Sequence, residues 1–82
     1  MELPRVRMYS RRRCGLCDEA REVIKSLRRE VAFEFEEVLI DGDDRLEGVY
    51  GLRIPVVEVD GTEEFEIRVD PQHLRDLVKR GA

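Results

Sequence analysis

The chain has 82 residues, which is enough for one domain with a modest core, and we expect residues 1–82 to form that single domain. Its formal net charge of −4 argues against a general affinity for nucleic acid. No apolar run of signal-peptide length opens the chain, and no stretch approaches the ~20 apolar residues that a membrane span requires. We therefore expect a cytoplasmic protein that binds neither nucleic acid nor membranes, and nothing in the sequence demands more than a monomer.

The first predicted elements, in chain order, are a short strand and a long helix. Val6, Met8 and Tyr9 belong to a β-like run that ends at Ser10. From Cys17 onward, apolar residues recur at helical spacing with charged residues between them: Ala20, Val23, Ile24, Leu27 and Val31. This pattern predicts the clearest helix of the chain.

The middle of the chain predicts a second strand and a short helix. Residues 33–36 alternate between apolar and charged side chains, and the apolar residues 38–40 continue the strand. The turn at residues 41–44 can cap a short helix, whose apolar residues are Leu46, Val49 and Tyr50. We expect Gly51 to end this helix in the left-handed conformation.

The last third of the chain predicts a hairpin followed by a helix. Residues 54–59 and 64–69 flank Asp60-Gly61, a strong hairpin signal, and Phe65, Ile67 and Val69 should share one face of the second strand. Asp70 should cap a final helix that begins at Pro71. The order strand–helix–strand–helix–strand–strand–helix predicts the α/β class, with one mixed sheet that carries helices on its faces.

Opposite charges alternate on three of these strands. Arg5 and Arg7 lie on the first strand, which should be central in the sheet. We expect them to form cross-strand pairs with the carboxylates of neighbouring strands, each worth ~0.2–1 kcal/mol, with the candidates Glu34, Glu36 and Glu58.

The two cysteines, Cys14 and Cys17, stand at the mouth of the long helix. A bridge between such close neighbours closes a tiny loop and would stabilise the fold little, so chemistry or metal binding explains them better. The unpaired N–H groups of a helix N-terminus favour a thiolate at Cys14. Arg11, Arg12 and Arg13 add positive charge, and such surroundings lower the pKa of a thiol from about 8.5 to the range ~3.5–7.5.

Two other interpretations of the cysteine pair remain open. A C-x-x-C motif can be half of a zinc site, but structural zinc needs four ligands, and the single histidine, His73, lies on a different predicted element. A metal or iron–sulfur carrier would therefore need a dimer that shares two cysteine pairs. A non-catalytic binding module would keep the cysteines unreactive. The position of the motif near a predicted βαβ unit favours redox chemistry.

As a whole, the sequence resembles the glutaredoxin-like branch of the thioredoxin superfamily, and within it a group of small bacterial glutaredoxin-like proteins with a Cys-Gly-Leu-Cys motif. The resemblance covers essentially the full chain and rests on these segments: Tyr9-Ser10 before Cys14-Gly15-Leu16-Cys17, Leu39-Ile40-Asp41, Tyr50-Gly51-Leu52-Arg53-Ile54-Pro55-Val56, and Asp60-Gly61. It implies a thioredoxin-like fold, in which a four-stranded mixed sheet of spatial order 2-1-3-4 is flanked by three helices.

The resemblance also implies an activity, that of a thiol–disulfide oxidoreductase. Cys14 would attack a substrate disulfide and Cys17 would resolve the mixed disulfide. Pro55 would be a cis proline that packs against the active-site disulfide, and the segment Arg53-Ile54-Pro55 would bind substrate through the backbone of Ile54. A proline is excluded from strand interiors, so Pro55 by itself already marks a turn or a binding edge.

The implied partners come from the same resemblance. The substrate would be a disulfide-containing protein or a glutathione-type disulfide, no bound cofactor is required, and reducing equivalents would come from glutathione or a flavoprotein reductase. Typical glutaredoxins hold glutathione with Thr-Val-Pro and Gly-Gly-x-Asp segments, whose counterparts here are Arg53-Ile54-Pro55 and Val69-Asp70-Pro71-Gln72. Thioredoxins carry a buried aspartate upstream of the first cysteine, where this chain has Met8.

Overall fold

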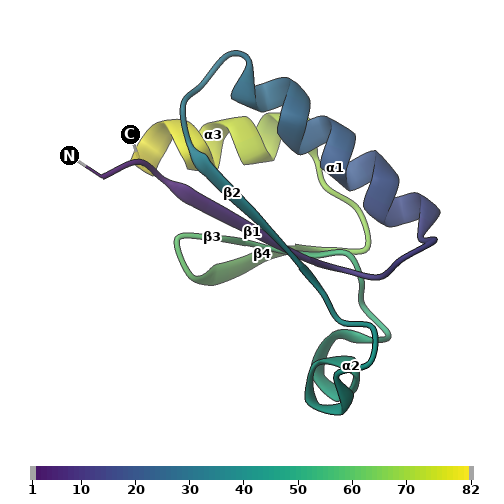
Figure 1. Cartoon of the computed structure of the whole chain (residues 1–82). Coiled ribbons are helices and arrows are strands. Elements are labelled where there is room, and N and C mark those ends of the chain that lie inside the picture. The colour runs from purple at the N-terminus through teal and green to yellow at the C-terminus, as the bar shows by residue number, and fades with distance from the viewer. Residues whose placement is uncertain (1, 82) are drawn as a thin grey trace.

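The computed structural model describes residues 2–81, in which two helices lie against one face of a four-stranded sheet (Figure 1). The elements follow the predicted order: β1 Arg5–Ser10, α1 Gly15–Arg28, β2 Glu34–Leu39, α2 Asp44–Tyr50, β3 Val56–Val59, β4 Thr62–Glu66 and α3 Pro71–Gly81. None of the helices in these residues is long and apolar enough to cross a membrane.

The strands lie in the spatial order β2-β1-β3-β4, as predicted. β1 runs parallel to β2 and antiparallel to β3, and β3 and β4 form an antiparallel hairpin. Asp60 and Gly61 connect the hairpin with φ angles of 51° and 86°. A two-residue turn with both φ angles positive matches the right-handed twist of the flanking strands, which is why Asp-Gly is favoured there.

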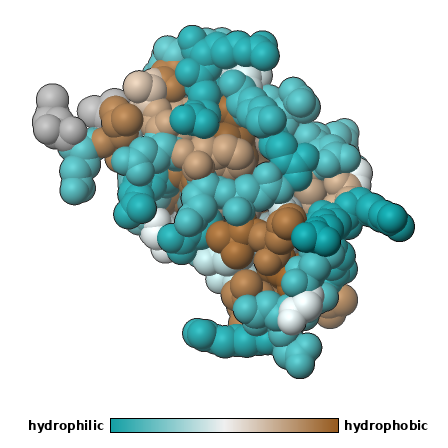
Figure 2. All heavy atoms as spheres, in the orientation of Figure 1, coloured by the Kyte–Doolittle hydropathy of each residue, from teal (hydrophilic) through white to brown (hydrophobic). Residues whose placement is uncertain are grey.

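The main core lies between the sheet and the helices α1 and α3. Alternate residues of β1 and β3 point to this face and meet the apolar stripes of the two helices, and the buried members include Val6, Met8, Ala20, Ile24, Leu27, Val57, Val59, Leu74 and Val78. A smaller cluster of Tyr9, Ile40 and Val56 lies on the other side, where α2 covers the end of the sheet. Figure 2 shows hydrophilic side chains over much of the visible surface and an apolar patch where α2 meets the sheet.

The rest of the second face carries the predicted ladder of opposite charges. Arg7 Nε lies 2.6 Å from Glu36 Oε1, and Arg7 Nη1 lies 3.9 Å from Glu58 Oε1. Arg5 Nε lies 3.7 Å from Glu34 Oε2. The prediction of cross-strand pairs is therefore confirmed. The charged residues are tolerated on the central strand because no helix covers this part of the face.

Caps define the ends of the two shorter helices largely as predicted. The side chain of Asp43 accepts a hydrogen bond from the Leu46 N–H at 3.0 Å, at the start of α2. The side chain of Asp70 accepts one from the Gln72 N–H at 3.1 Å, at the start of α3. The expectation for Gly51 was wrong, because this residue is right-handed, with φ −53°. The chain continues from α2 into a further turn, in which the Arg53 N–H bonds to the Tyr50 carbonyl at 2.9 Å.

The last strand also differs from its prediction. It ends at Glu66, and Ile67 has a φ of 71° and is exposed, so Ile67 does not share a strand face with Phe65 and Val69. The Ile67 N–H points instead to the carbonyls of Arg53 and Pro55, at 3.1 and 2.8 Å. The bond to Pro55 continues the register of the hairpin, in which Val56 pairs with Glu66, and the ladder ends there because proline has no N–H to donate in return. The alternation of apolar residues could not reveal a backbone contact with a loop that lies earlier in the sequence.

Candidate functional site

Cys14 and Cys17 lie together at the N-terminus of α1. Cys14 is the N-cap of the helix, with an extended backbone, and its Sγ accepts a hydrogen bond from the Cys17 N–H at 3.2 Å. Both thiols are free, Cys14 being half-buried and Cys17 fully buried. A helix begins here because the side chain of Cys14 satisfies one of the N–H groups that the first turn leaves unpaired. The same bond gives a thiolate at Cys14 a backbone donor.

The two thiols differ in their surroundings. Burial, and then the interaction of its thiol with the side chain of Cys14, raise the pKa of Cys17 to about 12. The backbone of Arg11 and the charge of the Arg21 guanidinium act in the opposite direction, since both favour the thiolate. Cys17 is therefore a protonated, interior thiol in the reduced protein, and Cys14 is the one that solvent can reach.

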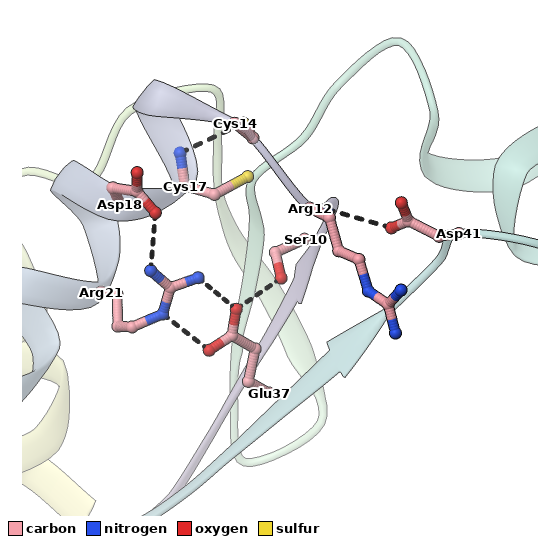
Figure 3. A network of polar contacts seen from close by, with 8 residues as sticks. All are labelled: Ser10, Arg12, Cys14, Cys17, Asp18, Arg21, Glu37 and Asp41. Atoms are coloured by element: carbon pink, nitrogen blue, oxygen red, sulfur yellow. Dashed lines mark hydrogen bonds and ion pairs between the residues drawn. The ribbon is translucent and has the colours of Figure 1, made fainter.

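The three predicted thiolate-stabilising arginines form the loop before Cys14, but their side chains and backbones make different contacts. The guanidinium of Arg11 forms an ion pair with Glu47 of α2. The backbone N–H of Arg12 donates to Asp41 Oδ1 at 3.1 Å, and its side chain points away from Cys14 (Figure 3). Arg13 is exposed and has a φ of 55°. Within residues 2–81, none of the three guanidinium groups is hydrogen-bonded to Cys14, so their role rests on long-range charge and stays a prediction.

The predicted substrate-binding segment lies at the same end of the sheet as the cysteine pair. The Ile54–Pro55 bond is cis, as the resemblance implied, and Pro55 is fully buried. Val56 pairs with Tyr9, so Pro55 lies at the level of Ser10, close to where β1 leads into the cysteine loop. The N–H and C=O of Ile54 form no hydrogen bond with any other described residue, whereas the carbonyls of Arg53 and Pro55 both accept from Ile67.

The side chain of Arg53 is held within the protein. Its guanidinium bonds to Glu63 Oε2 at 2.9 Å, to Glu66 Oε2 at 3.3 Å and to the Val49 carbonyl at 3.1 Å. The carboxylates of Glu63 and then Glu66 raise the pKa of Arg53, and Arg53 in turn lowers that of Glu63. Arg53 thus anchors the loop that carries Ile54 and Pro55, and its direct contact with a substrate remains a prediction.

A polar network beside Cys17 was not predicted (Figure 3). Arg21 donates from Nε to Glu37 Oε1 at 2.8 Å, from Nη2 to Glu37 Oε2 at 2.5 Å and from Nη1 to Asp18 Oδ1 at 2.8 Å. The buried hydroxyl of Ser10 donates to Glu37 Oε2 at 2.6 Å. Arg21, and after it Ser10, hold the pKa of Glu37 below its ordinary value, although burial opposes them.

Two sequence signals could have revealed this network. Glu37 lies two residues after Phe35 on β2, so both side chains point to the face of the sheet that the helices cover. Arg21 follows Cys17 by one helical turn, so the two residues share a face of α1. The charge of both residues suggested solvent exposure, and only the paired faces of strand and helix show that they meet.

One hollow of the described residues lies away from the cysteines. It has a volume of about 650 Å³ and lies over the charged ladder, between residues of β1 and β2 that include Arg5, Arg7, Glu34 and Glu36. Neither cysteine lines it. Across residues 2–81, no group of three or more histidine, cysteine, aspartate and glutamate side chains is arranged to hold a metal ion. The candidate site is the cysteine pair at the start of α1 with its neighbouring loops.

A four-stranded sheet of order 2-1-3-4 whose first helix is capped by a C-x-x-C cysteine defines a thioredoxin-like domain with a cysteine pair suited to redox chemistry. The family model described as "Glutaredoxin-like domain (DUF836)" matches residues 5–79. The chain belongs to this glutaredoxin-like family, which confirms the resemblance seen in the sequence. The fold and the nearby cysteines together suggest a redox function.

Individual relatives agree with this assignment. An uncharacterized protein of Mycobacterium bovis is 31% identical over 85 residues, which cover 98% of this chain and 88% of that protein. The X-ray structure of a structural-genomics target from X. campestris is 36% identical, with a TM-score of 0.76 over 94% of this chain and 99% of that one. A thioredoxin variant from Halobacterium salinarum, 22% identical, superposes with a TM-score of 0.67 over 98% of this chain and 75% of its own, and shows the shared fold.

Proposed function

We propose that this protein is a dithiol thiol–disulfide oxidoreductase in which Cys14 attacks and Cys17 resolves. The observation that carries the proposal is the asymmetric pair at the start of α1. Cys14 is reachable and accepts a backbone N–H at 3.2 Å, whereas Cys17 is buried and protonated one helical turn further on. Two sequential exchange steps require such a pair, with one accessible thiol that attacks the substrate and a second thiol that reacts only afterwards.

The reaction consists of two exchanges that balance without a cofactor. In the first, the Cys14 thiolate attacks one sulfur of a substrate disulfide, so the substrate S–S bond breaks, a mixed disulfide forms and one substrate thiolate leaves. In the second, Cys17 loses its proton and attacks Cys14 Sγ, which releases the other half of the substrate as a thiolate and forms the Cys14–Cys17 bond. The two leaving thiolates take up protons, and the protein is oxidised by two electrons.

The substrate would lie along the loop before β3. The unpaired N–H and C=O of Ile54 are available to an extended substrate backbone, in the way that a free strand edge accepts a peptide. Arg12 and Arg13 give this end of the molecule an exposed positive charge, which favours an anionic disulfide, either an acidic protein or glutathione disulfide. Glutathione or a flavoprotein reductase would return the Cys14–Cys17 disulfide to the dithiol.

Serine variants test the proposed function. In an assay with glutathione disulfide or a disulfide-bonded protein and dithiothreitol as the reductant, we expect Cys14→Ser to lose all activity above background, because the only reachable nucleophile is gone. In the same mixture without dithiothreitol, Cys17→Ser should carry out the first exchange but keep a protein substrate bound to Cys14 as the mixed disulfide. Full activity in the Cys14→Ser protein would contradict the proposal.

The two alternative functions give different results in the same preparation. A metal or iron–sulfur carrier would purify as a dimer that contains metal and loses it in the Cys14→Ser variant. A non-catalytic binding module would reduce no disulfide, and Cys14 would react with iodoacetamide at the rate of an ordinary free thiol. Either result would replace the oxidoreductase proposal.

A further inference from the structure

One end of the helix-covered face of the sheet is polar, and it is the end that carries the cysteines. On β1 and β3 this face is apolar, with Val6, Met8, Val57 and Val59 in the main core. Beside Cys17, however, the residues on this face are polar: Ser10 on β1 and Glu37 on β2. Arg21 of α1 reaches into the same space, and its side chain is 26% exposed.

This Arg21–Glu37 pair is built more elaborately than a surface ion pair. The guanidinium of Arg21 makes a bidentate contact with the carboxylate of Glu37. Glu37 also accepts a hydrogen bond from the fully buried hydroxyl of Ser10, and the remaining nitrogen of the guanidinium donates to Asp18. Arg75 and Glu30 form the comparable pair between α3 and the turn that follows α1, with more exposed side chains. That pair has no buried hydroxyl and no thiol beside it.

Stability alone does not explain a charged pair at this position. Taking two charges out of water costs free energy that their attraction only partly offsets, so apolar residues of similar size would often stabilise the fold as well or better. Charged groups in partly buried positions next to a reactive group commonly tune that group. Arg21 lies one helical turn after Cys17, and the Cys17 side chain points towards the side of α1 on which Ser10 and Glu37 lie (Figure 3).

We propose that Arg21 is a positioning residue for the resolving step: held in place by Glu37 and Asp18, its positive charge stabilises the thiolate that Cys17 must form before it attacks the mixed disulfide. The inference rests on the proposed function. It gives the network a specific role, because the fixed guanidinium favours the charged form of a thiol that burial disfavours.

Other charged and titratable groups also surround Cys17. Cys14 lies one turn before it, Glu37 faces it from β2, and Arg68 lies near the opposite side of α1, in the connection between β4 and α3. The carboxylates of Glu37 and Asp18 disfavour a nearby thiolate, so the benefit of Arg21 is what remains after their opposing effect. In the mixed disulfide Cys14 carries no charge, and the balance of Arg21 against these carboxylates then acts on the pKa of Cys17 beside the larger effect of burial.

Direct titration of Cys17 tests this proposal without any activity assay. In the Cys14→Ala protein, Cys17 is the only thiol, and its pKa can be followed by the ¹³Cβ chemical shift or by thiolate absorbance. We expect Arg21→Gln to raise this pKa by about one unit, because loss of a nearby positive charge disfavours the thiolate. Arg21→Lys should raise it by less than half as much, because the charge is kept. Arg75→Gln is the matched control and should leave it unchanged.

The same variants with Cys14 intact extend the test to kinetics. A rise of one unit in the pKa of Cys17 reduces its thiolate fraction tenfold at neutral pH but makes the thiolate more nucleophilic, so the decay of the mixed disulfide should slow about threefold. An unchanged pKa of Cys17 in folded Arg21→Gln, or equal rises in the Gln and Lys variants, would overturn the role of Arg21. Because the titration needs no turnover, such a result is distinct from a failure of the Cys14 assay, which would overturn the oxidoreductase function itself.

Discussion

Glu36 and Glu37 are consecutive residues of β2, and each bonds to an arginine, but they lie on opposite faces of the sheet. Glu36 meets Arg7 on the open face, where the two side chains are 60% and 43% exposed. Glu37 meets Arg21 beneath α1, where they are 22% and 26% exposed. The same kind of ion pair, arginine with glutamate, therefore occurs at two consecutive residues, once exposed to solvent and once largely covered.

The difference shows how environment decides what an ion pair does. On the open face, water and salt screen the charges, and pairs of this kind contribute about 0–1 kcal/mol. Under α1 the screening is weaker, a buried hydroxyl completes the network, and a buried thiol lies beside it. The exposed Arg7–Glu36 pair joins two neighbouring strands. The covered Arg21–Glu37 pair joins α1 to β2 and also acts on the neighbouring thiol of Cys17.

Among variants of the two ion pairs, Glu37→Gln should have the largest effect on the free energy of unfolding. We expect it to lower the free energy of unfolding by about 1–3 kcal/mol, because it leaves a partly buried guanidinium without its main partner. Urea denaturation monitored by circular dichroism measures this loss. Glu36→Gln is the matched control on the adjacent residue and should cost less than about 1 kcal/mol. Equal losses in the two variants would contradict the distinction.

A smaller effect should appear in the pH dependence of stability. Arg21 holds the pKa of Glu37 below its ordinary value of 4.5, so the unfolded chain binds this proton more readily than the folded protein does. The contribution of Glu37 is therefore fully present above pH 4.5 and is lost as the pH falls through its folded pKa. Stability measured from neutral pH down into this range should fall less steeply in Glu37→Gln than in the natural chain. An unchanged slope would show that Glu37 is not held ionised.

The smallest effect belongs to the open face. Arg7→Gln removes the contacts with Glu36 and Glu58, and we expect it to lower the free energy of unfolding by less than either Glu37→Gln or Glu36→Gln does. The difference from the natural chain should shrink further in 1 M salt, where the Debye length is about 3 Å. A loss that is large and independent of salt would mean that the open-face ladder is structural, contrary to its exposure.

Local pattern predicted most of the fold. The helical spacing of Ala20, Ile24 and Leu27 placed α1, and Asp60-Gly61 placed the hairpin, because these features depend on residues close together in sequence. The resemblance supplied the strand order and the cis bond before Pro55. Gly51 and Ile67 were predicted wrongly because their backbone conformations depend on the further turn after α2 and on hydrogen bonds to a distant loop.

The site could be predicted only in part, for a related physical reason. The C-x-x-C spacing and the helix start are local, and they identified Cys14 and Cys17. Ser10, Arg21 and Glu37 come from three elements and become one network only after β2 pairs with β1 beneath α1. Charge in the sequence also gave no sign of the partner of Arg11, which was predicted to act on Cys14 but pairs with Glu47 of α2.

The most direct test of the central claim, that Cys14 attacks and Cys17 resolves, is a trapping experiment with the Cys17→Ser protein. The reduced variant is mixed with a disulfide substrate, quenched with acid, and mapped by mass spectrometry after digestion. We expect a stable mixed disulfide at Cys14, which the natural chain would instead convert to a Cys14–Cys17 bond with release of the substrate thiol. Absence of any adduct at Cys14, with the substrate disulfide intact, would contradict it.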